Sequence, residues 1–173
     1  MEERVTYQLR RARASGTTGL GTEPIKVAPL LEDLKLTLDK VYRDEGISAE
    51  IEASKSVVFR GEGGDFTEIA GNIIENAYKY GSSRVHVRAW NEDGSLRLTV
   101  EDDGPGISAD KAEALMERGS RADESKPGQG IGLAVAREIA ALYQGQLDVS
   151  ESGLGGAQLD LTLRRASLKN EQK

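Results

Sequence analysis

The sequence predicts a single α+β domain, a two-layer sandwich with helices on one face of a mixed, mostly antiparallel sheet. Strand-like segments outnumber helical ones, and several strands follow one another as hairpins. This pattern is typical of α+β folds and disfavours a doubly wound parallel sheet. At 173 residues, the chain can close one sizeable core but is too short for two ordinary enzyme domains.

Composition excludes several classes of function. The chain has no cysteine and one histidine, which excludes disulfide frameworks, thiolate zinc sites and thiol nucleophiles. Its net charge is -6, and nucleic-acid binding needs clustered cations, so we expect no nucleic-acid partner. No apolar run approaches the roughly 20 residues of a membrane span. We therefore expect this stretch of chain to be soluble, whether or not it is part of a longer protein.

Residues 1–21 predict the end of a helix followed by a linker. Val5, Leu9 and Ala12 have helical spacing, and the Gly- and Thr-rich run after residue 14 breaks it. So short a helix is marginal alone in water. It belongs either to an element further upstream or to a plain N-terminal arm. With a polar tail at 167–173, residues 22–166 remain as the domain.

Hydrophobic periodicity places the elements of the domain in order. Alternating runs predict strands at 25–28, 49–53, 57–60, 84–90 and 95–102, and 3.6-residue spacing predicts helices at 30–43 and 66–80. A Gly-rich irregular region then leads to a further helix. A final pair of strands, joined by the glycine-rich turn at 153–156, completes the sheet.

The helix at 66–80 carries one apolar and one polar row. Asp65, followed three residues later by Glu68, forms a capping-box pattern that predicts the helix start. The apolar row should face the sheet; it consists of Ile69, Ile73 and Ala77. The polar row consists of Asn72, Asn76, Lys79 and Tyr80. Amide oxygens can bind Mg²⁺ beside phosphates and water, although a hydrated helix face alone would also explain this row.

The strand at 95–102 ends in the stretch "VEDDGPGI". Alternation places Asp102 at the strand end, and Gly104 and Gly106 then let the chain bend sharply. A buried aspartate here would accept a hydrogen bond from the amino group of adenine, while the glycines let the ring approach. A plain turn at a strand end is the alternative.

The stretch "KPGQGIGLAVAREIAALY", residues 126–143, begins as a glycine hinge and ends as an amphipathic helix. The amides of Gly128 to Gly132 should therefore lie at a helix N-terminus, where phosphates bind favourably. The glycine spacing matches neither a P-loop nor a dinucleotide fingerprint. Between Gly106 and Gly128 lie 21 residues rich in charge, a length that predicts a functional lid.

Together, in this order and spacing, residues 72–80, 102–106 and 128–132 resemble the N, G1 and G2 boxes of sensor histidine kinases. These kinases bind ATP through a catalytic domain of the GHKL ATPase superfamily. The resemblance covers about residues 25–165. It implies the Bergerat, or GHKL, fold, with helices on one face of the sheet and a long ATP lid.

The resemblance also implies a role for each box residue. Asp102 would bind the adenine amino group and Tyr80 would stack on or edge the ring. Asn72, Lys79 and Arg121 would form the catalytic set. Asn72, Asn76 and Gln129 would hold Mg²⁺ directly or through water, and Lys79, Arg121 and Lys126 would contact phosphates. The nucleotide-contacting set is completed by Gly104, Gly106, Ile107, Gly128, Gly130, Ile131, Gly132 and Leu133.

The implied activity is γ-phosphoryl transfer from Mg-ATP to a histidine on a dimerisation helix. By the same resemblance, residues 1–14 would be the end of such a dimerisation helix. The implied partners are the kinase's own dimerisation helices and a response regulator, and the implied location is the cytoplasmic side of the inner membrane. ATPases of the superfamily, such as gyrase, Hsp90 and MutL, carry a glutamate where this chain has Asn72, so we expect slow hydrolysis. A GHKL-type ATPase and a non-catalytic nucleotide-binding module remain as alternatives.

His86, the only histidine of the chain, does not fit a phosphoacceptor. It lies in "SRVHVRAW", where Val85, Val87 and Ala89 take one face of a strand and His86 takes the other. It also lacks the acidic residue that typically follows the acceptor in kinases of this kind. We therefore expect the acceptor histidine to lie outside this chain.

Overall fold

A five-stranded sheet organises the domain in the computed structural model, which describes residues 23–116 and 132–164. The strand order is β2-β4-β5-β7-β6, and the bounds are Ser48–Ala53, Arg84–Glu92, Ser95–Asp102, Ala157–Leu163 and Gln146–Glu151 in that order. Strands β2 and β4 are parallel, whereas the other three pairs are antiparallel. The predicted mixed, mostly antiparallel sheet is confirmed.

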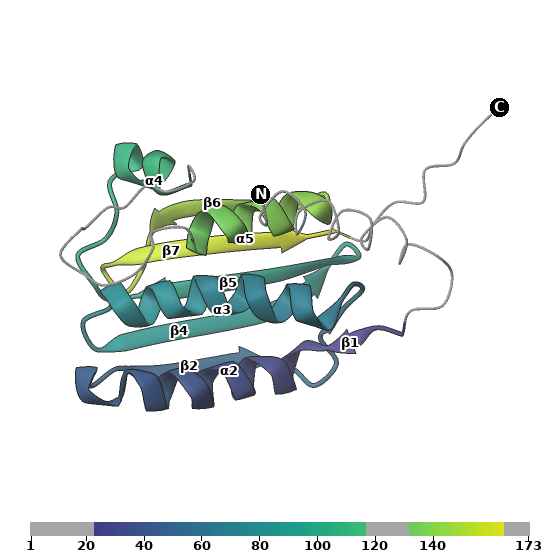
Figure 1. Ribbon diagram of the computed structural model, residues 1–173, viewed down its shortest axis with the longest axis horizontal. Coiled ribbons are helices and arrows are strands. Elements are labelled where there is room, and N and C mark those ends of the chain that lie inside the picture. Colours follow the sequence, from purple (N-terminus) through teal and green to yellow (C-terminus); the bar gives the residue numbers. More distant parts are fainter. Residues whose placement is uncertain (1–22, 117–131, 165–173) are drawn as a thin grey trace, which may run out of the picture.

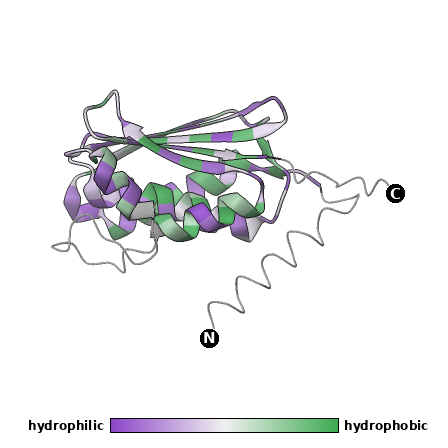
Figure 2. Cartoon of the chain, turned by 90° about the horizontal axis from the view of Figure 1, so that it is seen from above, coloured by the Kyte–Doolittle hydropathy of each residue, from purple (hydrophilic) through white to green (hydrophobic). Residues whose placement is uncertain are grey.

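Three helices cover one face of this sheet (Figure 1): α2, α3 and α5, with bounds Val27–Val41, Gly63–Tyr80 and Gly132–Leu142. Figure 2 shows the two layers from above, strands in one and helices in the other. The predicted two-layer sandwich is therefore confirmed. A short 3-10 turn, η1, spans Arg43–Glu45 after α2.

The core lies between the two layers. One row of side chains crosses all five strands in register: Ile51, Val87, Val100, Leu159 and Val149. From the helix side, the predicted row of Ile69, Ile73 and Ala77 is completely buried. Burial of each large aliphatic side chain contributes about 1.5 to 3 kcal/mol, so this apolar contact holds the helices on the sheet.

The N-terminal elements differ from the predicted ones. The strand expected at 25–28 is limited to β1, Ile25–Lys26, and α2 begins directly after it. Strand β1 pairs with β3, Val58–Phe59, in a separate two-stranded sheet. The side chain of Asn91 on β4 binds both the N–H and the carbonyl oxygen of Val58, at 2.9 and 2.8 Å. A side-chain amide thus occupies the edge of β3.

The predicted capping box at Asp65 is wrong. Helix α3 begins at Gly63, its N-cap residue is Glu62, and no side chain caps it. Asp65 lies within the first turn, is 9% exposed, and accepts a hydrogen bond of 2.7 Å from the Tyr143 hydroxyl. The local pattern assigned the Asp65 carboxylate to capping the helix backbone. In the fold it binds Tyr143, the residue after α5, instead.

The region expected to be irregular contains a helix. Residues Ala109–Met116 form α4, which lies at one end of the sheet in contact with α5 and β6 (Figure 1). The rest of the predicted lid, 117–131, lies outside the described residues, as do the expected N-terminal helix and linker and the expected polar tail. Within 23–116 and 132–164, no helix is both long and apolar enough to cross a bilayer.

Candidate nucleotide-binding site

Four segments meet at one end of the sheet: the end of α3, the end of β5, the start of α5 and the turn between β6 and β7 (Figure 1). A Cβ atom on Gly104 would lie 2.1 Å from the carbonyl oxygen of Tyr80, and one on Gly132 would lie 3.3 Å from Asn72 Oδ1. The backbone N–H of Ala157 lies 3.3 Å from Asp102 Oδ1. The fold thus brings together parts of all three stretches singled out in the sequence.

Asp102 is the buried acid of this end. It is 1% exposed, and its Oδ1 accepts hydrogen bonds from the N–H groups of Gly104, at 2.8 Å, and Ala157. Its Oδ2 is buried without a partner among the described residues. Burial raises the pKa of Asp102 although these two donors oppose the shift. Leaving a buried acceptor unpaired costs about 1 to 3 kcal/mol, so Oδ2 is suited to a donor supplied by a ligand.

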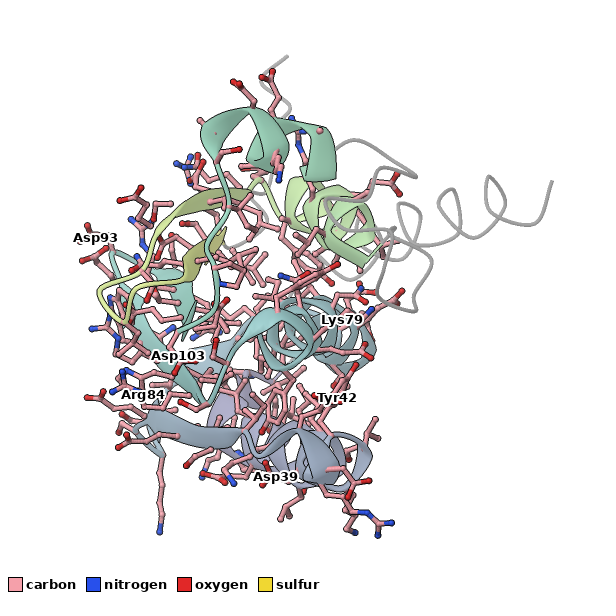
Figure 3. All side chains as sticks on the ribbon, turned by 90° about the vertical axis from the view of Figure 1, so that its left-hand side faces the viewer. Asp39, Tyr42, Lys79, Arg84, Asp93 and Asp103 are labelled. Carbon is pink, nitrogen blue, oxygen red and sulfur yellow. The ribbon has the colours of Figure 1, made fainter. Side chains whose placement is uncertain are left out.

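Asp103, the next residue, is fully engaged by the protein. Its Oδ1 accepts from the N–H groups of Ser82, Ser83 and Arg84 at 3.0, 2.8 and 2.9 Å, and its Oδ2 accepts from the Ser83 hydroxyl at 2.6 Å. Burial alone would raise the pKa of Asp103, but these donors hold it well below its usual range. Figure 3 shows Asp103 beside Arg84 at this end of the sheet. The carboxylate fastens the loop between α3 and β4 to β5.

The polar row of α3 borders the same end. Asn72, Asn76, Lys79 and Tyr80 are all half-buried, and Figure 3 shows Lys79 projecting from the helix layer. The Asn76 Nδ2 is buried and has no partner in the described part of the chain. The same residues contain no group of three or more His, Cys, Asp or Glu side chains able to hold a metal. An amide nitrogen donates hydrogen bonds and does not ligate Mg²⁺, so the expected metal role of Asn72 and Asn76 concerns their amide oxygens and stays a prediction.

Gly104 shows why glycine follows the strand end. Its missing side chain makes room for the backbone of Tyr80, because a Cβ atom would overlap the Tyr80 carbonyl oxygen. Gly106 has a φ of +76°, a conformation that other residues rarely adopt. The sequence predicts glycines that admit a ligand ring. The structure adds that the protein's own backbone requires Gly104.

The remaining predicted site residues fall into two groups. Ile107 packs half-buried against the core, and Leu133 lies within it. The rest lie outside the described residues: Arg121, Lys126, Gly128, Gln129, Gly130 and Ile131. Gly156 and Ala157 also lie against Asp102, a contact that the sequence motifs did not predict: a Cβ atom on Gly156 would lie 2.2 Å from Asp102 Oδ1, and the N–H of Ala157 donates to that oxygen. The double glycine before β7 is the signal that could have identified this contact.

Glu75, the acid nearest to Asn76 in the sequence, is hydrogen-bonded to the residue that ends α2. It is exposed and accepts a hydrogen bond of 2.9 Å from the Tyr42 hydroxyl. Burial, reinforced by Glu75, raises the pKa of Tyr42 to about 12. This contact ties Glu75 to the end of α2, away from a role as general base.

His86 takes the predicted face of the sheet, opposite the buried Val85 and Val87. It is half-buried, and its Nε2 lies 3.3 Å from Glu52 Oε2 while its Nδ1 lies 3.8 Å from Glu101 Oε2. The expected surface position on the sheet is confirmed. The helices lie on the other face, so the fold separates His86 from the helix layer.

Comparison with known proteins adds the family to this geometry. A family model described as "Histidine kinase-, DNA gyrase B-, and HSP90-like ATPase" matches residues 61–167. The stretches "VEDDGPGI" and "PGQGIGLAVAREI" resemble PhoQ in particular, with Lys126 where an arginine is expected. The chain is 43% identical over 165 residues to the sensor protein PhoQ of Escherichia coli K12. It is 44% identical over 167 residues to the virulence sensor histidine kinase PhoQ of Salmonella typhimurium.

These matches cover 95% of this chain and 34% of each relative, so the chain spans about a third of their length. Among solved structures, mycobacterial sensor histidine kinase MprB aligns with a TM-score of 0.72 at 24% identity, over 83% of this chain and 97% of that one. The catalytic domain of histidine kinase ThkA aligns with a TM-score of 0.74 at 13% identity, over 84% and 97%. At these identities the structures show the same fold, and the sequence matches go further: the chain belongs to the histidine kinase-, DNA gyrase B- and HSP90-like ATPase family.

Proposed function

We propose that this chain is the ATP-binding catalytic domain of a PhoQ-like two-component sensor histidine kinase. It would present Mg-ATP for γ-phosphoryl transfer to a histidine on dimerisation helices outside this chain. The observation that carries the proposal is Asp102, whose buried Oδ2 has no partner among the described residues at the point where the predicted boxes meet. Such an acceptor is suited to the amino group of adenine.

The site residues divide the work of binding. Asp102 accepts from the adenine amino group, and Tyr80, at the end of α3, stacks on or edges the ring. Lys79, Arg121 and Lys126 contact the phosphates beside the amides of Gly130 and Gly132. Asn72, Asn76 and Gln129 hold Mg²⁺ directly or through water. When bound, the ion neutralises charge on the phosphates, while the protein's part is positioning and charge compensation.

The asparagine at position 72 favours kinase over ATPase chemistry. Asn72 stands where superfamily ATPases carry a glutamate, and an amide cannot accept a proton near neutral pH. Glu75 is bound by the Tyr42 hydroxyl, so it is a poor substitute. The site thus retains the γ-phosphoryl group for another acceptor. A rapid ATPase activity of the chain alone would favour the GHKL-type ATPase instead.

The rest of the kinase is proposed from the resemblance to sensor histidine kinases. The intact protein sits in the inner membrane with this domain in the cytoplasm, dimerises through its own helices, and passes the phosphoryl group to a PhoP-like response regulator. His86 lies on the sheet face beside Glu52 and Glu101, away from the helix layer, so it is not the acceptor.

The test has two stages. First, ATP is titrated into the chain by calorimetry with and without Mg²⁺; we expect saturable binding that Mg²⁺ strengthens. Second, labelled ATP is supplied with the dimerisation helices added, and acid-labile phosphohistidine should form on those helices only. No ATP binding would refute the proposal. Label on the wild-type chain that disappears in His86→Ala would refute the external acceptor.

Asn76→Ala tests the metal assignment within the same titration. We expect the affinity measured with Mg²⁺ to fall more than the affinity measured without it, because the amide acts through the ion. Equal losses in both titrations would show instead that Asn76 is structural.

A further inference from the structure

The turn between β6 and β7 packs directly on Asp102. Within the turn, the N–H of Ser152 donates to the carbonyl oxygen of Gly156 at 2.8 Å, and the N–H of Gly155 donates to that of Ser152 at 3.0 Å. The N–H of Gly156 donates to the Asp102 carbonyl oxygen at 3.1 Å. The N–H of Ala157 donates to Asp102 Oδ1. The turn therefore holds both the backbone and the side chain of Asp102.

The Ser152 side chain holds this turn in shape. Ser152 is 9% exposed. Its hydroxyl accepts a hydrogen bond of 2.9 Å from the N–H of Leu154 and donates one of 3.3 Å to Glu101 Oε1. One hydroxyl thus links the backbone of the turn to a side chain of β5.

Glu101 provides a fixed anchor for that hydroxyl. It is 7% exposed, and Arg88 Nη2 donates to its Oε2 at 3.2 Å. Successive strand residues point to opposite faces, so Glu101 and Asp102 project from opposite faces of β5. The turn is therefore fastened to β5 on both faces, by Glu101 on one and by Asp102 on the other.

This arrangement determines which way the Asp102 carboxylate faces. Oδ1 has two donors, of which one, Ala157, belongs to the chain leaving the turn. If the turn shifts, Oδ1 keeps only the Gly104 donor and the carboxylate can rotate. The orientation of Oδ2, the unpaired oxygen, therefore depends on the turn.

We propose that Ser152, anchored by Glu101, is a positioning residue that orients Asp102 and so makes the site select a 6-amino over a 6-oxo purine. The inference rests on the proposed function. A correctly placed carboxylate accepts from the amino group of ATP and faces the oxo group of inosine triphosphate, ITP, with no donor between them. Sites built for one hydrogen-bonding pattern reject an analogue that lacks it, and a loosened Asp102 discriminates less.

The experiment measures ATP and ITP affinities of the 173-residue chain by calorimetry in wild type, Ser152→Ala and Ser152→Thr. We expect Ser152→Ala to lower the ATP:ITP affinity ratio about threefold to tenfold, the effect of one hydrogen bond. Ser152→Thr keeps the hydroxyl and should retain the wild-type ratio. The control is Ser150→Ala, an exposed serine of β6, which should leave the ratio unchanged.

Glu101 supplies a second pair of variants that tests the same link if Ser152→Ala does not fold. Glu101→Ala removes the anchor and should lower the ratio as Ser152→Ala does, whereas Glu101→Gln keeps an acceptor oxygen and should preserve it. Melting temperatures of all variants are recorded, because a merely structural role would weaken ATP and ITP binding equally. An unchanged ratio in Ser152→Ala or Glu101→Ala, with ATP binding intact in wild type, overturns the positioning role alone. Absence of ATP binding in wild type overturns the proposed function.

Discussion

Two buried aspartates at opposite ends of the sheet differ in how their oxygens are used. At the end where β5 stops, Asp102 Oδ2 has no partner in the described part of the chain. At the other end, Asp65 accepts a hydrogen bond from the buried Tyr143 hydroxyl, which itself accepts one from the N–H of Glu62 at 3.2 Å. Burial, reinforced by Asp65, raises the pKa of Tyr143, so the hydroxyl stays protonated as a donor.

The packing around the two aspartates also differs. The ring centroids of Tyr143 and Phe59 lie 5.0 Å apart in an edge-on arrangement, and the Phe59 ring also packs against Phe66. Around Asp102 the neighbours are glycine backbones. The buried carboxylate within the aromatic cluster joins elements of the fold, whereas the one among glycines keeps an unpaired oxygen that suits a ligand donor. The two ends should therefore respond oppositely to substitution.

The largest effect is expected from Asp102→Asn at the ligand end. The change keeps the shape but replaces an acceptor-only group with an amide that can misorient. We expect ATP affinity to fall at least tenfold, since each hydrogen bond to a charged group contributes about 1.5 to 3 kcal/mol. The free energy of unfolding should stay the same or rise, because an unpaired buried charge is removed. Calorimetry measures the ATP affinity, and urea unfolding measures the free energy of unfolding. Wild-type ATP affinity in the folded variant would remove the adenine assignment.

The opposite pattern is expected from Tyr143→Phe at the other end. Loss of the hydroxyl leaves Asp65 and the Glu62 N–H without their partner, so the free energy of unfolding should fall by about 2 kcal/mol. ATP affinity should not change, because the site lies at the other end of the sheet. Tyr42→Phe is the control. The Tyr42 hydroxyl binds an exposed carboxylate, and we expect its loss to lower the free energy of unfolding by less than about 1 kcal/mol. A large loss of ATP affinity in Tyr143→Phe would contradict the separation of the two ends.

The smallest effect concerns Asp103, whose pKa is lowered by its hydrogen-bond donors. A lowered folded-state pKa contributes stability that is complete above the unfolded value of about 3.9 and is lost as pH falls through the folded value. Asp103→Asn keeps an acceptor oxygen but removes the charge. We expect this substitution to lower the free energy of unfolding by about 1 kcal/mol at neutral pH. The fall of that free energy below about pH 4 should be less steep than in the wild type. Urea unfolding at several pH values measures this decline, and identical pH profiles for variant and wild type would show that Asp103 is not the group responsible.

Local patterns predicted much of the fold and the principal acid of the site. Alternation placed Val85 and Val87 on the core face, His86 on the other face and Asp102 at a strand end. The i, i+4 spacing separated the buried row of α3 from its polar row. These predictions succeeded because each depends on a repeat of the backbone itself, which any buried sheet or helix must follow.

Predictions that required knowing a distant partner failed or were missing. The sequence determined the two-layer architecture, the order of the strands along the chain and the stretches that carry chemistry, since periodicity and glycine spacing are properties of neighbouring residues. Only the tertiary structure decided that Asp65 binds Tyr143 instead of capping α3, and that Ser152 links the β6–β7 turn to Glu101. It also decided that Asp103 fastens a loop while the buried Asp102 keeps one oxygen without a partner among the described residues. Adjacent carboxylates look alike in sequence, and their roles differ because the donors that reach them come from residues far away in the chain.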